Sequence, residues 1–227
     1  DGYIDHLYCA RYLKSENLSA YFFPPINSIN GEFLDVNAIH ILIGTRGLEV
    51  KTILEEIEKI CFSKNFNLIF NNQELEFQNY IEKFNLKNND DDKNTLMLRR
   101  ILQKDLIGEN NRKYTLKKLI NKFISKKTSE LAKDFYLSLS NLKEMKSMGM
   151  YFGSHGNTHR WLNTLNPADQ KSEIEISFES LKRFQLISDH EPKVLCYPFG
   201  AYDNNTLNIL NKLNIDIGLT TKVGSSK

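Results

Sequence analysis

The sequence predicts an α/β fold in which a parallel sheet or (β/α) barrel is interrupted by a helical insertion. At both ends of the chain, short apolar runs typical of buried strands alternate with stretches of helical periodicity. Such alternation is typical of right-handed βαβ units, which place parallel strands side by side. The middle of the chain, residues 44–139, instead carries long amphipathic patterns. With 227 residues, the chain can bury a sizeable core as one large domain or as two small ones.

The N-terminal part predicts one helix and one strand. Residues 5–17, DHLYCARYLKSEN, have helical periodicity, and Asn17 suits the end of the helix. The residues at helical spacing are Leu7, Ala10, Leu13 and Lys14. Residues 19–23, SAYFF, predict a short buried strand that Pro24 and Pro25 close.

The C-terminal part predicts three helices, each followed by a strand. These pairs are residues 140–149 with 150–154, 166–184 with 193–200, and 204–214 with 215–221. Ser140 is expected to cap the first helix and Gly149 to end it. Asn166 is expected to cap the second, with Pro167 at its first position and Asp169 completing a box-like cap. The positions expected to face the core are Leu142, Met145, Ile174, Phe178 and Leu181.

The middle of the chain predicts two amphipathic helices separated by the polar loop NLKNNDDDKN, residues 85–94. Their apolar positions are Val50, Ile53, Leu54, Ile57, Ile60 and Cys61 in the first helix, and Leu116, Leu119, Ile120, Phe123 and Ile124 in the second. The lysines of residues 112–133 alternate with apolar positions, as on the solvated face of a helix. With a net charge of only +2, the sequence therefore indicates no nucleic-acid partner.

The composition indicates a cellular compartment, and the first residue indicates that the chain is a fragment. The longest clean apolar run, AIHILIG at residues 38–44, is far too short to span a bilayer. Three widely spaced cysteines, Cys9, Cys61 and Cys196, argue against a disulfide framework and favour a reducing, cytoplasmic compartment. A secreted protein with free buried thiols is the alternative. Because the chain begins with Asp1 rather than Met, we expect it to be a piece of a longer protein, with chemistry outside it.

The stretch YFGSHGNTHRWL, residues 151–162, contains two histidines four residues apart. His155 and His159 can reach one metal ion from a single turn, but such a pair is also common as two unrelated surface imidazoles. Its position favours a site, because it directly follows a predicted buried strand, at the edge where α/β folds place their functional loops. The segment YPFGAYD, residues 197–203, is expected at the same edge.

Three segments resemble the polysaccharide deacetylases, the NodB-type proteins of carbohydrate esterase family four. GMYFGSHGNTHRWLNTL resembles the family's His-Ser/Thr-x-x-His motif, LCYPFGAYD its Pro-aromatic motif, and the N-terminal DGYIDHLYCARYLKSENLSAYFF the region after its Asp-Asp motif. The resemblance covers about the first forty and the last ninety residues. It implies a distorted parallel (β/α) barrel of NodB type, truncated at both ends. Residues 1–227 would form a single catalytic domain with residues 44–139 inserted in it.

The resemblance also implies roles for individual residues. Asp1, His155 and His159 would be the metal ligands, with zinc as the expected ion and cobalt or nickel as alternatives. Pro198 and Phe199 would wall the substrate groove, and the catalytic contribution of Phe199 would be a backbone N–H that holds the oxyanion. The rings of Tyr197 and Tyr202 would either stack on sugar or pack in the barrel interior.

The sequence departs from the family pattern at several positions. The family's catalytic base would stand before Asp1, and no Leu-x-His motif follows residues 215–227 to supply the general acid. We expect excision to explain both absences. Gly156 replaces a bracing Ser or Thr, and Cys196 replaces the arginine of many members. His190 is expected on the surface, at the opposite edge of the sheet, and His40 as a half-buried, hydrogen-bonded side chain, with a place at the groove rim as the alternative.

The function expected from the resemblance is metal-dependent removal of N-acetyl groups from an amino sugar or polysaccharide. Two alternatives remain: an O-acetyl esterase on the same site, or a non-catalytic carbohydrate-binding relative. The residue encoded before Asp1 distinguishes the last from an enzyme, because an aspartate there supports catalysis.

Overall fold

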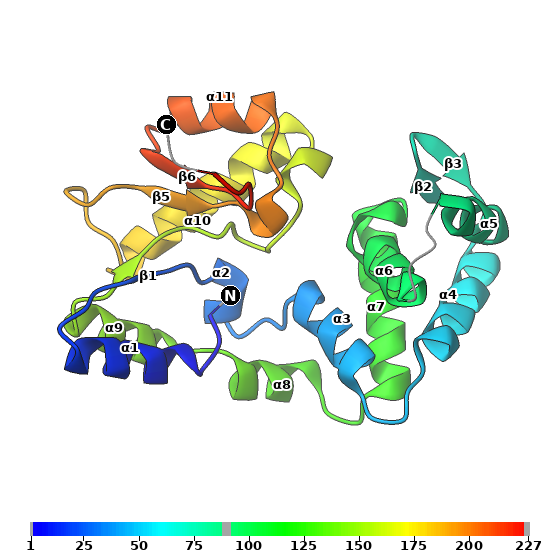
Figure 1. Ribbon diagram of the computed structural model, residues 1–227, viewed down its shortest axis with the longest axis horizontal. Coiled ribbons are helices and arrows are strands. Elements are labelled where there is room, and N and C mark those ends of the chain that lie inside the picture. Colours follow the sequence, from blue (N-terminus) through cyan, green and yellow to red (C-terminus); the bar gives the residue numbers. More distant parts are fainter. Residues whose placement is uncertain (1, 88–91, 225–227) are drawn as a thin grey trace. The chain divides into compact units, whose positions relative to one another are not determined.

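The computed structural model describes residues 2–87 and 92–224, which form two compact units (Figure 1). The first unit comprises Asp1–Leu34 and Thr128–Lys227, and the second comprises Asp35–Lys127. The second unit therefore both begins and ends earlier than the predicted insertion at residues 44–139. Its role as an insertion within one catalytic domain stays a prediction.

The first unit alternates helices with short strands, as the sequence predicts. Its helices are α1 (His6–Ser15), α2 (Ile26–Ile29), α8 (Thr128–Phe135), α9 (Leu139–Ser147), α10 (Pro167–Arg183) and α11 (Asn204–Lys212), with 3-10 turns η2 (Leu162–Thr164) and η3 (Pro198–Gly200). Its strands are β1 (Tyr21–Phe22), β4 (Tyr151–Phe152), β5 (Val194–Cys196) and β6 (Ile217–Leu219). Each strand lies within a segment predicted as a strand.

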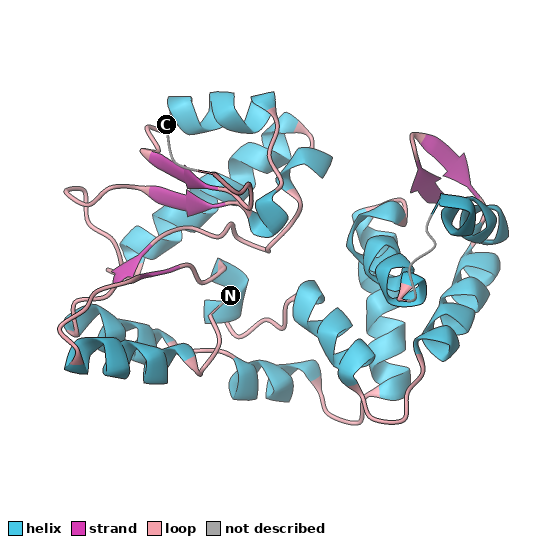
Figure 2. Ribbon diagram, in the orientation of Figure 1, coloured by secondary structure: helices cyan, strands magenta, loops and turns pink. Residues whose placement is uncertain are grey.

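The strands of the first unit are parallel. β1 pairs with β4 and β5 with β6 (Figure 2). A parallel bridge between Ser154 and Leu195 connects the two pairs. The prediction of a parallel α/β arrangement is thus confirmed. The barrel is not, because the strands found within residues 2–87 and 92–224 do not close on one another.

Two hydrophobic clusters support this sheet. One contains Leu7 and Ala10 of α1, Leu142 and Met145 of α9, Phe152 of β4 and Leu181 of α10. The other contains Ile174 and Phe178 of α10, Leu195 of β5, and Ile209 and Leu210 of α11. All five C-terminal positions expected to face the core are buried in these clusters, which confirms the helical periodicity read from the sequence.

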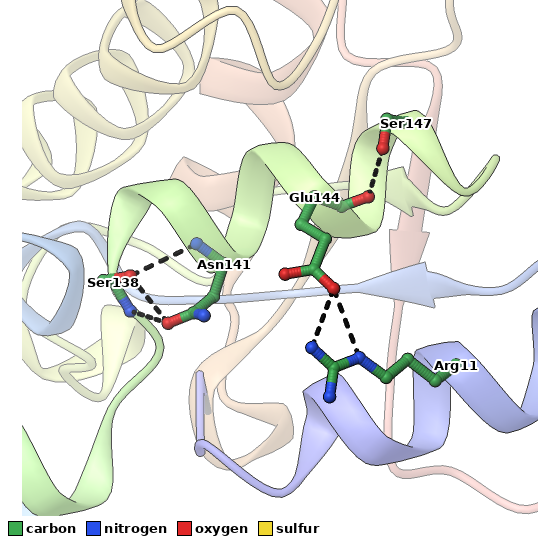
Figure 3. A network of polar contacts seen from close by, with 5 residues as sticks. All are labelled: Arg11, Ser138, Asn141, Glu144 and Ser147. Atoms are coloured by element: carbon green, nitrogen blue, oxygen red, sulfur yellow. Dashed lines mark hydrogen bonds and ion pairs between the residues drawn. The ribbon is translucent and has the colours of Figure 1, made fainter.

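The helix starts show where local signals succeed and fail. The Asn166 side chain accepts a hydrogen bond from the Asp169 N–H at 2.9 Å, as predicted for α10. For α9 the predicted cap, Ser140, is wrong. Ser138 is the cap and forms a capping box with Asn141, so the helix begins two residues earlier (Figure 3). Both serines precede the same apolar pattern, and the local sequence does not distinguish them.

A salt bridge on the surface of the first unit joins α1 to α9. Arg11 Nη2 lies 2.8 Å from Glu144 Oε1, and Arg11 Nε donates to the same oxygen at 3.2 Å. Figure 3 shows the two side chains meeting between the helices. Because both are largely exposed, we expect this pair to stabilise the unit by no more than about 1 kcal/mol.

The second unit is mainly helical. It contains α3 (Asp35–Gly44), α4 (Val50–Lys64), α5 (Phe77–Lys87), α6 (Lys93–Arg100), α7 (Glu109–Phe123), a π-helical turn η1 (Ile101–Asp105), and an antiparallel hairpin of β2 (Leu68–Phe70) and β3 (Gln73–Leu75). The two predicted amphipathic helices are α4 and α7. Part of the predicted polar loop, residues 88–91, lies outside the described residues.

Two expectations about polar side chains concern this unit. His40 is exposed on α3 rather than half-buried, because the other face of α3, with Ile39 and Leu42, covers the core. Cys61 is buried in α4, and burial raises the pKa of its thiol to about 12. Among the described residues all three cysteines are free thiols, as predicted.

The buried carboxylate of Asp105 joins two side chains inside the second unit. Asp105 Oδ2 accepts hydrogen bonds from the Tyr80 hydroxyl at 2.7 Å and from Arg100 Nε at 2.9 Å. The Arg100 guanidinium also lies over the rings of Phe70 and Phe84. Burial, and then the Asp105 charge, raise the pKa of Tyr80, so its hydroxyl stays protonated and donates.

We expect Asp105→Ala to destabilise the second unit strongly. The change leaves the Tyr80 hydroxyl and the Arg100 guanidinium without their acceptor, and breaking a buried ion pair costs about 3–5 kcal/mol. Urea denaturation measures the loss. Glu82→Ala, which removes an exposed carboxylate from α5, should change the unfolding free energy by less than about 0.5 kcal/mol. Equal midpoints for the two variants would contradict a structural role for the Asp105 carboxylate.

Candidate metal centre and substrate groove

The two histidines lie just beyond the carboxyl end of β4, as predicted. The Ser154 N–H donates to the Val194 carbonyl at 2.8 Å, so β4 continues alongside β5 up to the residue before His155. The PFG segment follows the end of β5 as the turn η3. Two neighbouring parallel strands therefore deliver both predicted motifs to one edge of the sheet.

The imidazoles of His155 and His159 are close together. Their ring centroids are 4.6 Å apart with the planes at 74°, and each residue is 8% exposed. His155 Nδ1 lies 2.7 Å from the Cys196 carbonyl oxygen. Because a carbonyl only accepts, Nδ1 carries a proton, and in the neutral ring Nε2 then carries the lone pair. A backbone carbonyl that orients a histidine in this way is typical of metal ligands.

His159 is held as a neutral imidazole. Burial, and then the neighbouring His155, lower the pKa of His159 to about 3. At neutral pH its ring therefore keeps a lone pair for a cation. Its backbone adopts a left-handed conformation, with φ of 60°, which non-glycine residues rarely adopt outside strained or functional positions.

Glu173 of α10 anchors the loop between the histidines. Its Oε2 accepts the N–H groups of Asn157 at 3.0 Å and Thr158 at 2.9 Å, and its Oε1 accepts the Thr158 hydroxyl at 2.6 Å. This residue was not predicted from the sequence. The signal that could have revealed it is a polar stripe at helical spacing along α10, formed by Gln170, Glu173, Ser177 and Ser180, all of them buried.

The loop has further supports at both ends. The hydroxyls of Ser154 and Ser177 lie 2.7 Å apart, and the Gly156 N–H donates to Ser154 Oγ at 3.2 Å. The N–H groups of Ile26 and Asn27, at the start of α2, donate to the carbonyls of Gly156 and Asn157. The backbone path from His155 to His159 is therefore determined by contacts with β5, α10 and α2.

Gly156 does not leave the loop unbraced. A Cβ atom there would lie 3.3 Å from Glu173 Oε2, and the residue has a φ of 76°, so glycine suits the position. Position 156 lacks the hydroxyl typical of the family, but the Thr158 hydroxyl donates to Glu173 Oε1 in the same loop. The loop is therefore supported from position 158 by Glu173 of α10, while position 156 itself carries no hydroxyl.

Phe199 also has a left-handed backbone, with φ of 58°. Its ring stacks on Trp161 at a centroid distance of 4.6 Å and an angle of 11°, and meets the edge of His159 at 4.7 Å. The N–H groups of Gly200 and Ala201 donate to the carbonyls of Tyr197 and Pro198. Trp161, which was not predicted from the sequence, is thus part of the aromatic wall beside the histidines.

The other predicted residues are placed as follows. Tyr197 is buried in the second hydrophobic cluster, where it stacks on Tyr202 at 4.8 Å, so the structure favours packing over sugar contact for its ring. Pro198 is buried in η3. His190 is exposed in the loop before β5, as predicted. Asp1, the predicted carboxylate ligand, lies outside the described residues.

Within the part of the chain that the structure describes, no third histidine, cysteine or carboxylate joins the pair to make a complete three-ligand group. The two imidazoles nevertheless fit a transition metal in their chemistry. Both are near-buried, one has a fixed tautomer, and neutral imidazole suits zinc and its neighbours. No described helix is both long and apolar enough to cross a membrane.

Known proteins are similar in sequence to the part of the chain that contains the candidate site. The family model for polysaccharide deacetylase matches residues 107–218, which include both histidines, Glu173 and the PFG turn but not Asp1. A Bacillus subtilis (strain 168) protein, YxkH, whose name assigns it provisionally to the polysaccharide deacetylases, is 32% identical over 91 residues. That match covers 40% of this chain and 32% of YxkH, so the chain spans about a third of its length.

A solved structure, the Streptococcus pyogenes deacetylase PplD in complex with acetate, is 33% identical over 42% of this chain and 41% of that chain, with a TM-score of 0.38. The family model covers the region that holds the candidate site, and the curated relative carries the name of the same family. They confirm the resemblance read from the motifs, with residues 107–218, just under half of the chain, matching the polysaccharide deacetylase model.

Proposed function

We propose that the chain carries the metal centre of a hydrolase that removes N-acetyl groups from an amino sugar or polysaccharide. The observation that carries this proposal is the pair of buried, adjacent imidazoles of His155 and His159. The hydrogen bond from His155 Nδ1 to the Cys196 carbonyl directs its Nε2 lone pair away from the strand. Membership of the deacetylase family supports the acetylated carbohydrate as the substrate class.

His155 and His159 would hold the ion, and Asp1 is the proposed third ligand. The chemistry that a divalent cation supplies when bound there is Lewis acidity toward the acetyl carbonyl and ionisation of a water at neutral pH. We favour zinc, with cobalt and nickel as alternatives, because imidazole suits all three. The backbone N–H of Phe199 is the proposed donor to the developing oxyanion, a contribution typically of about 10²–10³-fold in kcat.

The aromatic wall supports a groove beside the ion. Trp161 stacked on Phe199 presents an apolar surface next to His159, on which the acetyl group or a sugar face can pack. We propose that the same stacking helps to hold Phe199 in its left-handed conformation, and with it the direction of its N–H. Positioning and packing are thus provided by one pair of rings.

Two alternative functions use the same residues. An O-acetyl esterase would share the site and differ only in its substrate, so hydrolysis of N-acetylated and O-acetylated sugars by the full-length protein separates the two. A non-catalytic carbohydrate-binding relative would keep the groove and hydrolyse neither substrate.

The metal content of the purified chain tests the proposal. We expect elemental analysis to find a transition metal at close to one ion per chain, and the double variant His155→Ala, His159→Ala to have lost it. Both samples should be dialysed against zinc and then against metal-free buffer. An absence of metal from the unsubstituted chain after this treatment would overturn the proposed metal centre in the chain as it stands.

A further inference from the structure

The two histidines are held by one face of α10. Ser177 contacts Ser154, the residue before His155, and Glu173 contacts Asn157 and Thr158, the residues before His159. Glu173 and Ser177 are four residues apart, so both project from the same side of the helix. Both ends of the loop from Ser154 to Thr158 are therefore hydrogen-bonded to one helix, α10, which fixes the distance between them.

The contacts of Glu173 are all directed at this loop. The residue is 7% exposed, and each of its oxygens accepts hydrogen bonds from Asn157 or Thr158. Hydrogen bonds to a carboxylate are the strong ones in proteins, especially when buried. The side chain is anchored in turn, because its neighbour Ile174 is completely buried and the Asn166 cap fixes the start of α10.

The loop needs this anchor because its backbone is strained. Gly156 and His159 both have positive φ, of 76° and 60°. A histidine keeps such a conformation only where surrounding contacts over-determine it. The N–H groups bound by Glu173 belong to the two residues immediately before His159, so loss of the carboxylate frees the backbone at the point where the ring direction is decided.

We infer that Glu173 is the positioning residue of this metal centre: its carboxylate sets the path of the loop and thereby holds the His159 ring beside the His155 ring. This inference deepens the proposed function and rests on it for the identity of the ligand. In this role Glu173 makes its three hydrogen bonds to Asn157 and Thr158. It acts through the backbone of residues 157–158, and its effect is on where the ligands lie.

The hydrogen-bond pattern determines which substitutions to compare. Glu173→Ala removes all three contacts. Glu173→Gln keeps the side-chain shape: its amide oxygen can accept both N–H groups and its NH₂ can donate to Thr158 Oγ1, since a hydroxyl both donates and accepts. Thr158→Val removes one contact only. Glu179→Ala, an exposed carboxylate on the same helix, is the matched control.

The experiment measures two properties of these variants. The first is Co(II) and Zn(II) affinity by competition with a chromophoric chelator. The second is the imidazole ¹⁵N–¹H spectrum of the metal-free protein, which reports the tautomer and environment of His155 and His159. We expect Glu173→Ala to weaken metal binding by about 10–100-fold, the usual effect of losing a residue that orients ligands. Its His159 signals should shift.

We expect Glu173→Gln to recover most of the affinity and the native imidazole signals, Thr158→Val to fall between it and Glu173→Ala, and Glu179→Ala to match the unsubstituted chain. Unchanged affinity and unchanged His159 signals in Glu173→Ala would overturn the inference. If the unsubstituted chain binds no metal, the proposed function fails. The imidazole spectra alone then decide whether Glu173 positions the His159 ring. A His159 shift in Glu173→Ala but not in Glu173→Gln or Glu179→Ala supports positioning, and no shift overturns it. Should Glu173→Ala not fold, Thr158→Val answers the same question.

Discussion

Replacing His159 with alanine or glycine is expected to abolish stoichiometric metal binding while the chain still unfolds cooperatively. The ring is one of the two proposed ligands among the described residues, so its loss should leave His155 unable to retain an ion against dialysis. The fold should survive because the two clusters of the first unit draw on α1, α9, α10, α11, β4 and β5, among other segments, and include no residue from His155 to His159. Elemental analysis and urea denaturation measure the two outcomes.

The comparison between alanine and glycine adds a test of the backbone. His159 has a φ of 60°, which costs a residue with a Cβ about 1–2 kcal/mol and costs glycine almost nothing. His159→Gly should therefore be more stable than His159→Ala by about 1 kcal/mol. His190→Ala, in an exposed loop, should retain both metal and stability. Metal retained by His159→Ala would contradict the role of this ring as a ligand, and loss of cooperative unfolding would contradict its independence from the core.

Gly153→Ala is expected to destabilise the first unit and to disturb the site. A Cβ atom at Gly153 would lie 2.4 Å from Phe23 Cε1 and 2.6 Å from the Val194 carbonyl oxygen. That carbonyl accepts the Ser154 N–H, so any shift that relieves the clash moves the strand end on which His155 depends. Overpacking of this kind typically costs about 1–3 kcal/mol, and here one of the clashing atoms belongs to the backbone.

The matched control for this change is Gly44→Ala at the end of α3, where the added Cβ meets nothing within 4 Å. It should leave stability unchanged or raise it by about 0.4–1 kcal/mol, through the loss of freedom in the unfolded chain. Urea denaturation followed by circular dichroism distinguishes the two variants. A Gly153→Ala variant as stable as Gly44→Ala would show that β4 and β5 are not packed as closely as described.

Local and periodic features were predictable from the sequence. The apolar spacing of Leu142, Met145, Ile174, Phe178 and Leu181 identifies the buried faces of α9 and α10, because helix periodicity dictates which residues share a side. The Asn166 cap and the placement of both motifs after strands follow from equally local rules. The cap of α9 did not, because Ser138 and Ser140 offer the same chemistry two residues apart.

The candidate site was predictable only in part. His155, His159 and Phe199 could be named from their motifs, and the structure brings their rings together. Glu173 and Trp161 could not be named. Glu173 of α10 binds Asn157 and Thr158, and Trp161 stacks on Phe199 of η3, so neither contact is visible in the local sequence. Tyr197, for which the sequence left sugar stacking and core packing open, lies in the second hydrophobic cluster.

By itself, the sequence determined the α/β class of the fold, the order of most elements in the first unit, the resemblance to the deacetylase family and the positions of the two histidines, because each depends on residue type and spacing along the chain. Only the tertiary structure decided the His155 tautomer, the neutral state of His159, and the anchoring of their loop by Glu173. These properties arise from contacts between β4, β5 and α10, and such contacts exist only once separate segments are packed together.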